Sequence, residues 1–262
     1  MNRINPKLFD RAKKYFPSDR HELRVAAGNF HYIKREYEDW KSELDLLHNF
    51  TTPEMELYYL AISTAMHHFE TFFEFSQALE YLLDHRRANI VPAICIILRQ
   101  SLESALTASW ICAEPDIKNI AQRGYQVTIR DLNNQYNFAK ELRAYDSADH
   151  NLTHINMEQI EMRKLELLII GNQLGYSGRQ VKEIYKPLIT KLFKNSEFAG
   201  KKRNLNWAYT LLSSIGHGTW IGFYPADKEL TAMVKMRDQS LRETLNKLRT
   251  RTAPIARDRL SS

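Results

Sequence analysis

Apolar residues recur every three to four positions along most of this chain, the spacing that brings side chains onto one face of an α-helix. Runs that alternate apolar and polar residues are missing, and so are the Asn-Gly and Asp-Gly turns that favour β-hairpins. Only nine glycines and eight prolines interrupt the 262 residues. The pattern therefore predicts an all-α protein, a single-domain bundle of about nine helices.

Two of the expected helices carry apolar residues around most of their circumference, which is typical of buried helices. The first starts at Thr52 and Pro53 and runs to about His85. The second opens at Asn89 and covers residues 90–112, and it is predicted to be the central helix of the bundle.

Short polar residues and prolines mark the starts of the other helices. We expect these starts at Asn5, Ser18, Asp116, Asn156, Ser177, Asn204 and Pro225. The second of these helices is expected to run without a break to about His48, and the fourth to end at Gly171 or Gly175, because glycine is common after a helix C-terminus.

The helices are expected to group around one core. Residues 51–224 are predicted to form the bundle core, with residues 1–50 packed on it as an N-terminal helical hairpin. Residues 225–262 are predicted to form a basic C-terminal helix and tail. Residues 145–155 lack periodicity, which indicates a crossover loop.

The net charge is +6 and is unevenly placed. Residues 235–262 contain eight basic and three acidic side chains, so this end carries +5 of the +6. Lys201, Lys202 and Arg203 form a second basic group and are candidates for binding nucleic acid. The alternative is a solvated helical face, since runs of charge usually serve solubility.

Several function classes are excluded by what the chain lacks. Cys95 and Cys112 lie in apolar sequence without metal-ligand spacing, which is typical of a protein of the reducing cytoplasm. The first residues have no apolar signal segment, and no stretch is apolar enough to span a membrane, so we expect a cytoplasmic protein without a membrane partner. Motifs for dinucleotides, NTPs and nucleophilic hydrolysis are missing, and no cofactor is expected.

Two charges interrupt the predicted central helix. Arg99 and Glu103 are four residues apart, so their side chains share one face and can pair or together hold a third polar group. A buried charge needs a partner. The pair is therefore either an internal ion pair that sets the helix register or part of a functional site.

A second polar stripe lies on a later helix that has no charged residues. Tyr209, Ser213 and His217 are spaced at i, i+4 and i+8 and so share a face. Buried hydroxyl and imidazole groups need polar partners. We therefore predict that His217 and Ser213 face Glu103 and Arg99 across a helix interface, where a carboxylate would raise the pKa of the histidine. A satisfied core histidine is the alternative.

These two segments carry a resemblance. An Arg and a Glu one turn apart (Arg99, Glu103), followed over a hundred residues later by Leu-Ser, three residues and His-Gly (ending in His217), are similar to the signature of an uncharacterised bacterial family of all-helical proteins. The resemblance extends from about Ala65 to about Phe223. That family is likened to the HEPN superfamily, helical bundles that include metal-independent RNases of toxin–antitoxin and phage-defence systems.

The resemblance implies RNA as the partner and a role in defence or stress. HEPN enzymes place an Arg and a His, with four to six residues between them, at a dimer interface, so a homodimer is implied as well. One match to that spacing, Arg143 with His150, falls in or next to the predicted loop. For a nuclease we therefore assign His217 as general base, with Arg99 stabilising phosphate charge.

Two alternatives come from other classes. The first is a non-catalytic binding or interaction protein in which Arg99, Glu103, Ser213 and His217 form a structural network. The second is a metal-binding or small-molecule-binding bundle enzyme, since His67, Glu70 and Glu74 share a helix face and, with Glu103 and His217, supply ligand types for iron or manganese. The Glu-x-x-His order of di-iron bundles is missing, so no metal is assigned.

Overall fold

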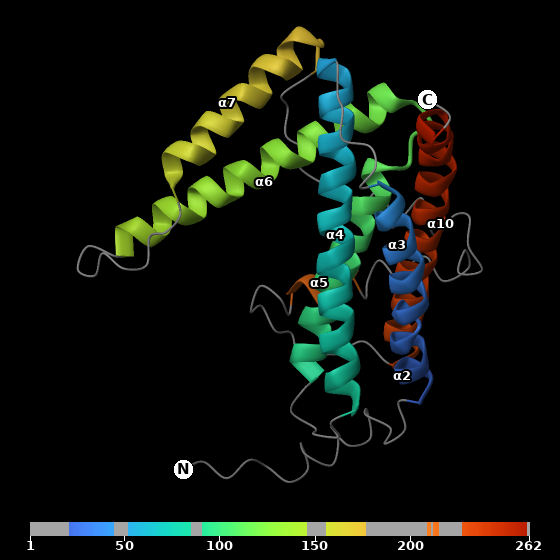
Figure 1. The fold of residues 1–262 in the computed structure, drawn as a ribbon. Coiled ribbons are helices and arrows are strands. Elements are labelled where there is room, and N and C mark those ends of the chain that lie inside the picture. The colour runs from blue at the N-terminus through green and yellow to red at the C-terminus, as the bar shows by residue number, and fades with distance from the viewer. Residues whose placement is uncertain are drawn as a thin grey trace. The chain divides into compact units, whose positions relative to one another are not determined.

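The computed structural model describes residues 21–44, 52–84, 91–145, 156–176, 209–210, 212–214 and 227–260, and all of the regular structure in these ranges is helical (Figure 1). The all-α prediction is therefore confirmed for this part of the chain. It contains seven helices, together with helical residues among 209–214, where about nine helices were expected. The helices expected to start at Asn5 and Ser177 lie outside the described residues.

The helices follow one another along the chain, numbered as in Figure 1. They are α2 (His21–Gly28), α3 (Phe30–Leu44), α4 (Pro53–Asp84), α5 (Val91–Ile111), α6 (Ile117–Tyr145), α7 (Met157–Gln173) and α10 (Asp227–Leu260). The predicted bounds of α4, α5 and α6 agree with these to within a few residues.

The N-terminal region differs from the prediction of one unbroken helix. It is divided at Asn29 into α2 and α3. The backbone N–H of Asn29 donates to the carbonyl of Ala26 at 3.2 Å, and that of Tyr32 donates to the carbonyl of Asn29 at 3.2 Å, so the chain makes tight three-residue turns there. Glycine and asparagine are weak helix formers, and the adjacent Gly28 and Asn29 explain the break.

The helix starts predicted from polar residues are correct where the structure describes them. The backbone N–H of Met55 donates to the Thr52 hydroxyl at 3.3 Å at the start of α4. The side chain of Asn156 accepts hydrogen bonds from the backbone of Glu158 and Gln159 at 3.1 and 3.3 Å at the start of α7. These bonds satisfy N–H groups that have no partner inside the helix.

Of the two glycines expected to end α7, Gly175 does so. Its φ is +70°, which glycine adopts without strain, and the N–H of Tyr176 donates back to the carbonyl of Gly171 at 2.8 Å. Gly171 itself lies inside the helix, where a Cβ atom would be 2.6 Å from Cζ of Tyr125. The absence of a side chain at Gly171 therefore lets α7 pack closely on α6.

The chain divides into two compact units. The first unit comprises residues 1–46, 68–109 and 185–262, and the second comprises residues 47–67 and 110–184. One division falls inside α4, whose earlier part belongs to the second unit. The predicted boundaries at residues 50/51 and 224/225 lie outside the described residues and stay predictions.

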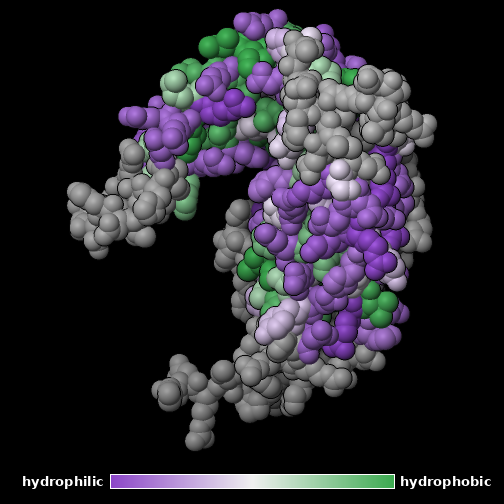
Figure 2. Space-filling view, in the orientation of Figure 1, coloured by the Kyte–Doolittle hydropathy of each residue, from purple (hydrophilic) through white to green (hydrophobic). Residues whose placement is uncertain are grey.

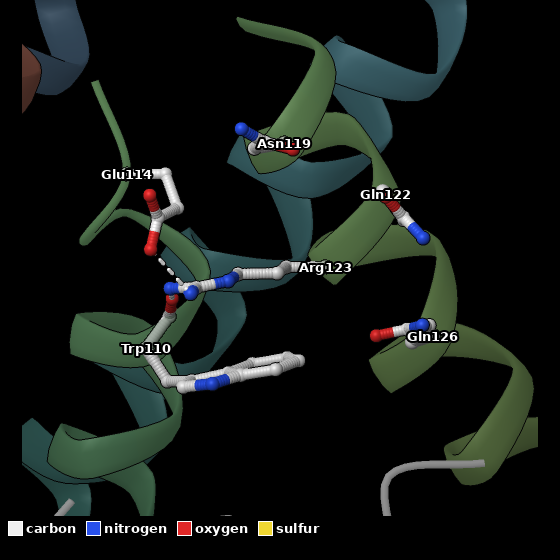
Figure 3. A pocket seen from close by; sticks show the side chains of 6 residues that line it. All are labelled: Trp110, Glu114, Asn119, Gln122, Arg123 and Gln126. Atoms are coloured by element: carbon white, nitrogen blue, oxygen red, sulfur yellow. Dashed lines mark hydrogen bonds and ion pairs between the residues drawn. The ribbon is translucent and has the colours of Figure 1, made fainter. Parts of the chain in front are cut away.

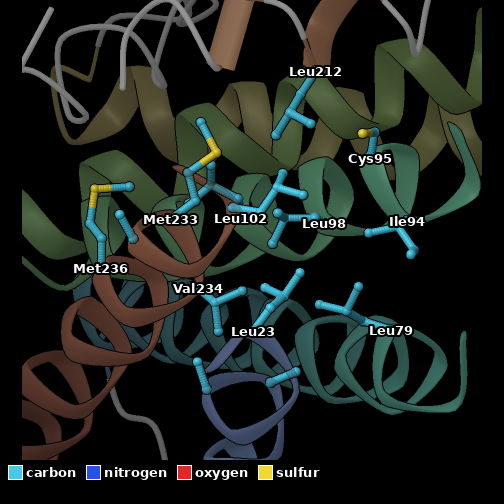
Figure 4. Close-up of a cluster of buried hydrophobic side chains, with 14 of the residues drawn as sticks. Leu23, Leu79, Ile94, Cys95, Leu98, Leu102, Leu212, Met233, Val234 and Met236 are labelled. Atoms are coloured by element: carbon cyan, nitrogen blue, oxygen red, sulfur yellow. The ribbon is translucent and has the colours of Figure 1, made fainter. Parts of the chain in front are cut away.

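The first unit is built around α5 and α10. Leu98 and Leu102 of α5, Met233 and Val234 of α10, and Leu23 of α2 are buried in one apolar cluster (Figure 4). Helix α10 packs against both α2 and α3. Burial of these side chains is the main favourable contribution to folding of the unit.

Aromatic side chains continue this core between α3 and α4. Tyr37 and Phe69 are stacked with their ring centroids 5.3 Å apart, and Trp40 is fully buried beside Tyr37. Burial, reinforced by the carboxylate of Glu70, raises the pKa of the Tyr37 hydroxyl. The hydroxyl is therefore held as a neutral donor toward Glu70, at 3.2 Å.

The second unit joins the first part of α4 with α6 and α7. A Cβ atom at Gly124 of α6 would lie 2.2 Å from Cβ of Ala61, so the two helices are in backbone contact at this point. The hydroxyls of Thr64 and Thr128 are 3.0 Å apart one turn further along both helices. Small residues thus determine how closely α4 and α6 approach.

The surface of the described residues is mixed in polarity. Green, hydrophobic residues interrupt the purple ones over α6 and α7 in Figure 2, and Met162, Leu165 and Ile169 of α7 are each more than half exposed. No described helix has the length and the apolar character needed to cross a membrane.

Candidate functional site

The two charges of the central helix form an ion pair, as one of the predicted readings required. Arg99 Nε donates to Glu103 Oε1 at 2.8 Å, and the side chain of each residue is 13% exposed. Leu98 and Leu102, their neighbours on α5, are fully buried. The apolar surroundings of α5 therefore bring both charges close to the interior, and the spacing of four residues lets them meet.

The later polar stripe reaches this pair. The Tyr209 hydroxyl donates to Glu103 Oε1 at 3.0 Å, and Arg99 Nη1 donates to the backbone carbonyl of Ser213 at 3.4 Å. Leu212, next to Ser213, is fully buried in the apolar cluster of the first unit. Tyr209 and Ser213 therefore contact α5 through polar groups, and Leu212 packs in the apolar cluster to which α5 contributes.

The structure thus brings together four of the five predicted site residues, which we call the α5 network: Arg99, Glu103, Tyr209 and Ser213. The prediction placed the Ser213 hydroxyl at the charges, whereas the contact found is made by its backbone carbonyl.

The remaining predicted residues lie outside the described part of the chain. His217, the assigned general base, is one of them, and so are Lys201, Lys202 and Arg203. Their roles as a base and as nucleic-acid contacts stay predictions.

In the α5 network, both members of the ion pair are engaged by groups of the protein itself. Glu103 Oε1 accepts hydrogen bonds from a guanidinium and from a phenol, and Arg99 uses two of its nitrogens on Glu103 and on a carbonyl. Charge-assisted hydrogen bonds of this kind are stronger than those between neutral groups. The arrangement is suited to holding two segments together.

A second polar group, which the sequence analysis missed, lies on α10. Arg237 is fully buried; its Nε donates to Asp238 Oδ1 at 2.9 Å and its Nη1 to the Ser101 hydroxyl at 3.0 Å. The prediction had counted Arg237 within a basic helix and tail at the end of the chain. Position 237 continues the buried positions of α10 at 230, 233, 234, 241 and 245, and that spacing was the signal that could have revealed it.

Asp238 completes this buried pair. Burial raises the pKa of its carboxyl group, and the neighbouring Arg237 lowers it, with burial the larger effect. The oxygen Oδ2 of Asp238 has no hydrogen-bond partner among the described residues. Arg237 and Asp238 therefore form a buried pair that is only partly satisfied.

Hydroxyl groups join α5 to α10 further along the same interface. The hydroxyls of Ser109 and Ser240 are 2.6 Å apart, and the Thr244 hydroxyl donates to that of Ser109 at 2.9 Å. We call these residues, with Ser101 and Arg237, the α5–α10 polar seam.

The residues considered for a metal are engaged otherwise or exposed. Glu70 accepts hydrogen bonds from the Tyr37 hydroxyl and, at 2.6 Å, from Lys41 Nζ. His67 and Glu74 are on exposed positions of α4. Within the described ranges no three His, Cys, Asp or Glu side chains are grouped so that they could hold a metal ion.

Comparison of the chain with family models, curated proteins and solved structures found no match. The resemblance to the all-helical bacterial family and to HEPN proteins therefore stays a prediction.

Proposed function

We propose that this protein is a non-catalytic binding protein and that its α5 network is structural, fastening residues 209–214 to α5. The observation that carries the proposal is that Glu103 Oε1 receives both the Arg99 guanidinium and the Tyr209 hydroxyl. The negative charge is thereby compensated inside the protein. In this proposal the binding partner of the protein contacts surface residues and not the α5 network.

Exposure supports the same conclusion. Stabilising the charge of a reacting phosphate requires a cation that faces the substrate. The side chain of Arg99 is only 13% exposed, and its Nε and Nη1 are directed to Glu103 and to the carbonyl of Ser213. Using Arg99 on a phosphate would require breaking contacts that hold the fold together.

A metal-independent RNase is the second candidate, in line with the sequence resemblance. It is favoured by the contact of Tyr209 and Ser213 with Glu103 and Arg99, because the i, i+4 spacing in the sequence predicts that His217 shares a helix face with Ser213. In this hypothesis His217 is the general base and RNA the substrate, and the homodimer implied by the resemblance completes the site.

Cleavage of labelled tRNA and single-stranded RNA in EDTA separates the two. The proteins compared are the wild type, His217→Ala, Glu103→Gln and Tyr209→Phe, with Glu74→Gln as a control on an exposed position of α4. Circular dichroism and urea unfolding are recorded for each. The proposal predicts no cleavage by the wild type, and a loss of about 1–3 kcal/mol of stability in the Glu103 and Tyr209 variants but not in the control.

Cleavage by the wild type that disappears in folded His217→Ala would overturn the proposal in favour of the nuclease. Full stability of Glu103→Gln would also contradict it, because the substitution removes the negative charge that compensates Arg99 inside the network.

A further inference from the structure

The second unit contains a polar pocket that the function proposed above does not use. It has a volume of about 350 Å³ and lies where α5 ends and α6 begins (Figure 3). It is lined by Trp110, Glu114, Asn119, Gln122, Arg123 and Gln126. This volume falls within the range of small-molecule sites in proteins.

One wall of the pocket is a rigid aromatic and cationic stack. The Arg123 guanidinium lies over the Trp110 indole, 4.9 Å from its centroid. Arg123 also donates to the Trp110 carbonyl at 2.7 Å and pairs with Glu114, as the dashed line in Figure 3 marks. The charge of Arg123 is thus neutralised by Glu114, and the side chain is fixed over the ring.

The face of α6 that carries Arg123 also presents amides. Asn119, Gln122 and Gln126 recur at i, i+3 and i+7 on α6, so they belong to one face of the helix. None of the three has a hydrogen-bond partner for its side-chain amide among the described residues. Each amide offers two N–H donors and one carbonyl acceptor. In Figure 3 the amide of Gln126 points toward the indole of Trp110.

We propose that this pocket binds a nucleobase, with adenine as the preferred base. Bases stack on Arg guanidinium planes as well as on aromatic rings, so the Arg123 guanidinium, held flat over Trp110, offers a plane that supplies affinity. Glutamine and asparagine amides pair with adenine through one donor and one acceptor, which supplies selectivity.

The charges that line the pocket do not favour binding of a phosphate group. Arg123, the one cation among the described residues that line it, is occupied by Glu114 and by a backbone carbonyl. The site therefore recognises the base of a nucleotide rather than its phosphate. The shared chemistry is an adenine ring, supplied either by a free nucleoside or nucleotide or by single-stranded RNA.

The test is a calorimetric titration of the full chain with four probes: adenosine, AMP, ribose 5-phosphate and an oligoadenylate of single-stranded RNA. Adenosine and AMP are expected to bind with similar affinity, and ribose 5-phosphate is expected not to bind. Tighter binding of the oligoadenylate than of AMP identifies RNA as the source of the base, and equal binding identifies a free nucleotide. Both results support the proposal.

Variants then locate the site. Gln122→Ala and Gln126→Ala should each weaken adenosine binding about fivefold to tenfold, because each removes one neutral hydrogen-bonding group. The matched control is Gln135→Ala, an exposed amide on the same helix outside the pocket. Trp110→Phe keeps a ring and should weaken binding less than Trp110→Ala does.

Three results would overturn the proposal. They are no saturable binding of adenosine by the folded wild type, binding of ribose 5-phosphate as tight as that of AMP, and binding that the two glutamine variants leave unchanged. Because the Gln122 and Gln126 side chains are partly exposed, both variants are expected to fold, so loss of binding reports on the pocket.

Discussion

The guanidinium of Arg237 lies over the ring of Phe72, 4.7 Å from its centroid, in the interior of the first unit. Arg237 is fully buried, and it also pairs with Asp238 and donates to Ser101. A cation–π contact away from water is worth more than one at the surface. Three different groups therefore offset the cost of burying this charge.

Replacing Arg237 with methionine should destabilise the protein by about 3 kcal/mol, because Asp238 would stay buried without its cation. The double variant Arg237→Met/Asp238→Asn removes both charges and should recover much of this loss. Urea unfolding followed by circular dichroism measures both values. A double variant less stable than Arg237→Met alone would show that the loss of stability does not come from the unpaired, buried carboxylate of Asp238.

The stability contributed by Asp238 should depend on pH. Burial raises the pKa of its carboxyl above the ordinary value of 3.8, so the folded protein holds this proton more tightly than the unfolded chain does. The contribution is fully present below that value and is lost as pH rises through the folded pKa. The wild type should therefore lose stability relative to Asp238→Asn as pH is raised from about 3.5, in urea unfolding at successive pH values. The opposite slope would mean that Arg237 outweighs burial.

Gly124→Ala should destabilise the second unit by about 1–3 kcal/mol, since the new Cβ would lie 2.2 Å from Cβ of Ala61 and force α4 and α6 apart. Gly28→Ala is the matched control: its Cβ would meet the Glu80 carboxylate at 3.4 Å, an ordinary contact. Thermal unfolding of both variants gives the comparison. Equal midpoints would show that the helices separate at no cost.

The hydroxyls of the α5–α10 polar seam should act as a unit. Ser109→Ala and Thr244→Val each remove one partner of the 2.9 Å hydrogen bond and should cost about 1–2 kcal/mol. A double-mutant cycle should give a coupling energy of about 0.5–1 kcal/mol. Full additivity of the two losses would mean that the hydrogen bond contributes nothing to stability.

Much of the fold could be predicted because local chemistry determines it. Thr52 and Asn156 start helices through their own side chains, and the apolar circumference of α5 indicated burial of Arg99 and Glu103. The polar stripe that includes Tyr209 was recognised from its helical spacing, and the structure shows the Tyr209 hydroxyl on Glu103.

The remaining features depend on tertiary contacts. Ser213 meets Arg99 through a backbone carbonyl, a group that every residue carries and that no sequence pattern can single out. Arg237 was predicted to lie in a solvated basic helix and tail because charged side chains are usually exposed to solvent. Only its helical spacing from the buried positions of α10 indicated that it is buried. The break at Asn29 was missed because the apolar period continues through it into α3.

The adjacency of Arg237 and Asp238 bears on how the first unit assembles. Neighbours in the chain can pair in an isolated helix without closing a loop, whereas the contact from Arg237 to Ser101 joins positions 136 residues apart. The two opposite charges can therefore enter the collapsing interior together. The hydrogen bond to Ser101 of α5 and the contact with the Phe72 ring of α4 must both await the long-range docking of α10, and that step is expected to be late and slow.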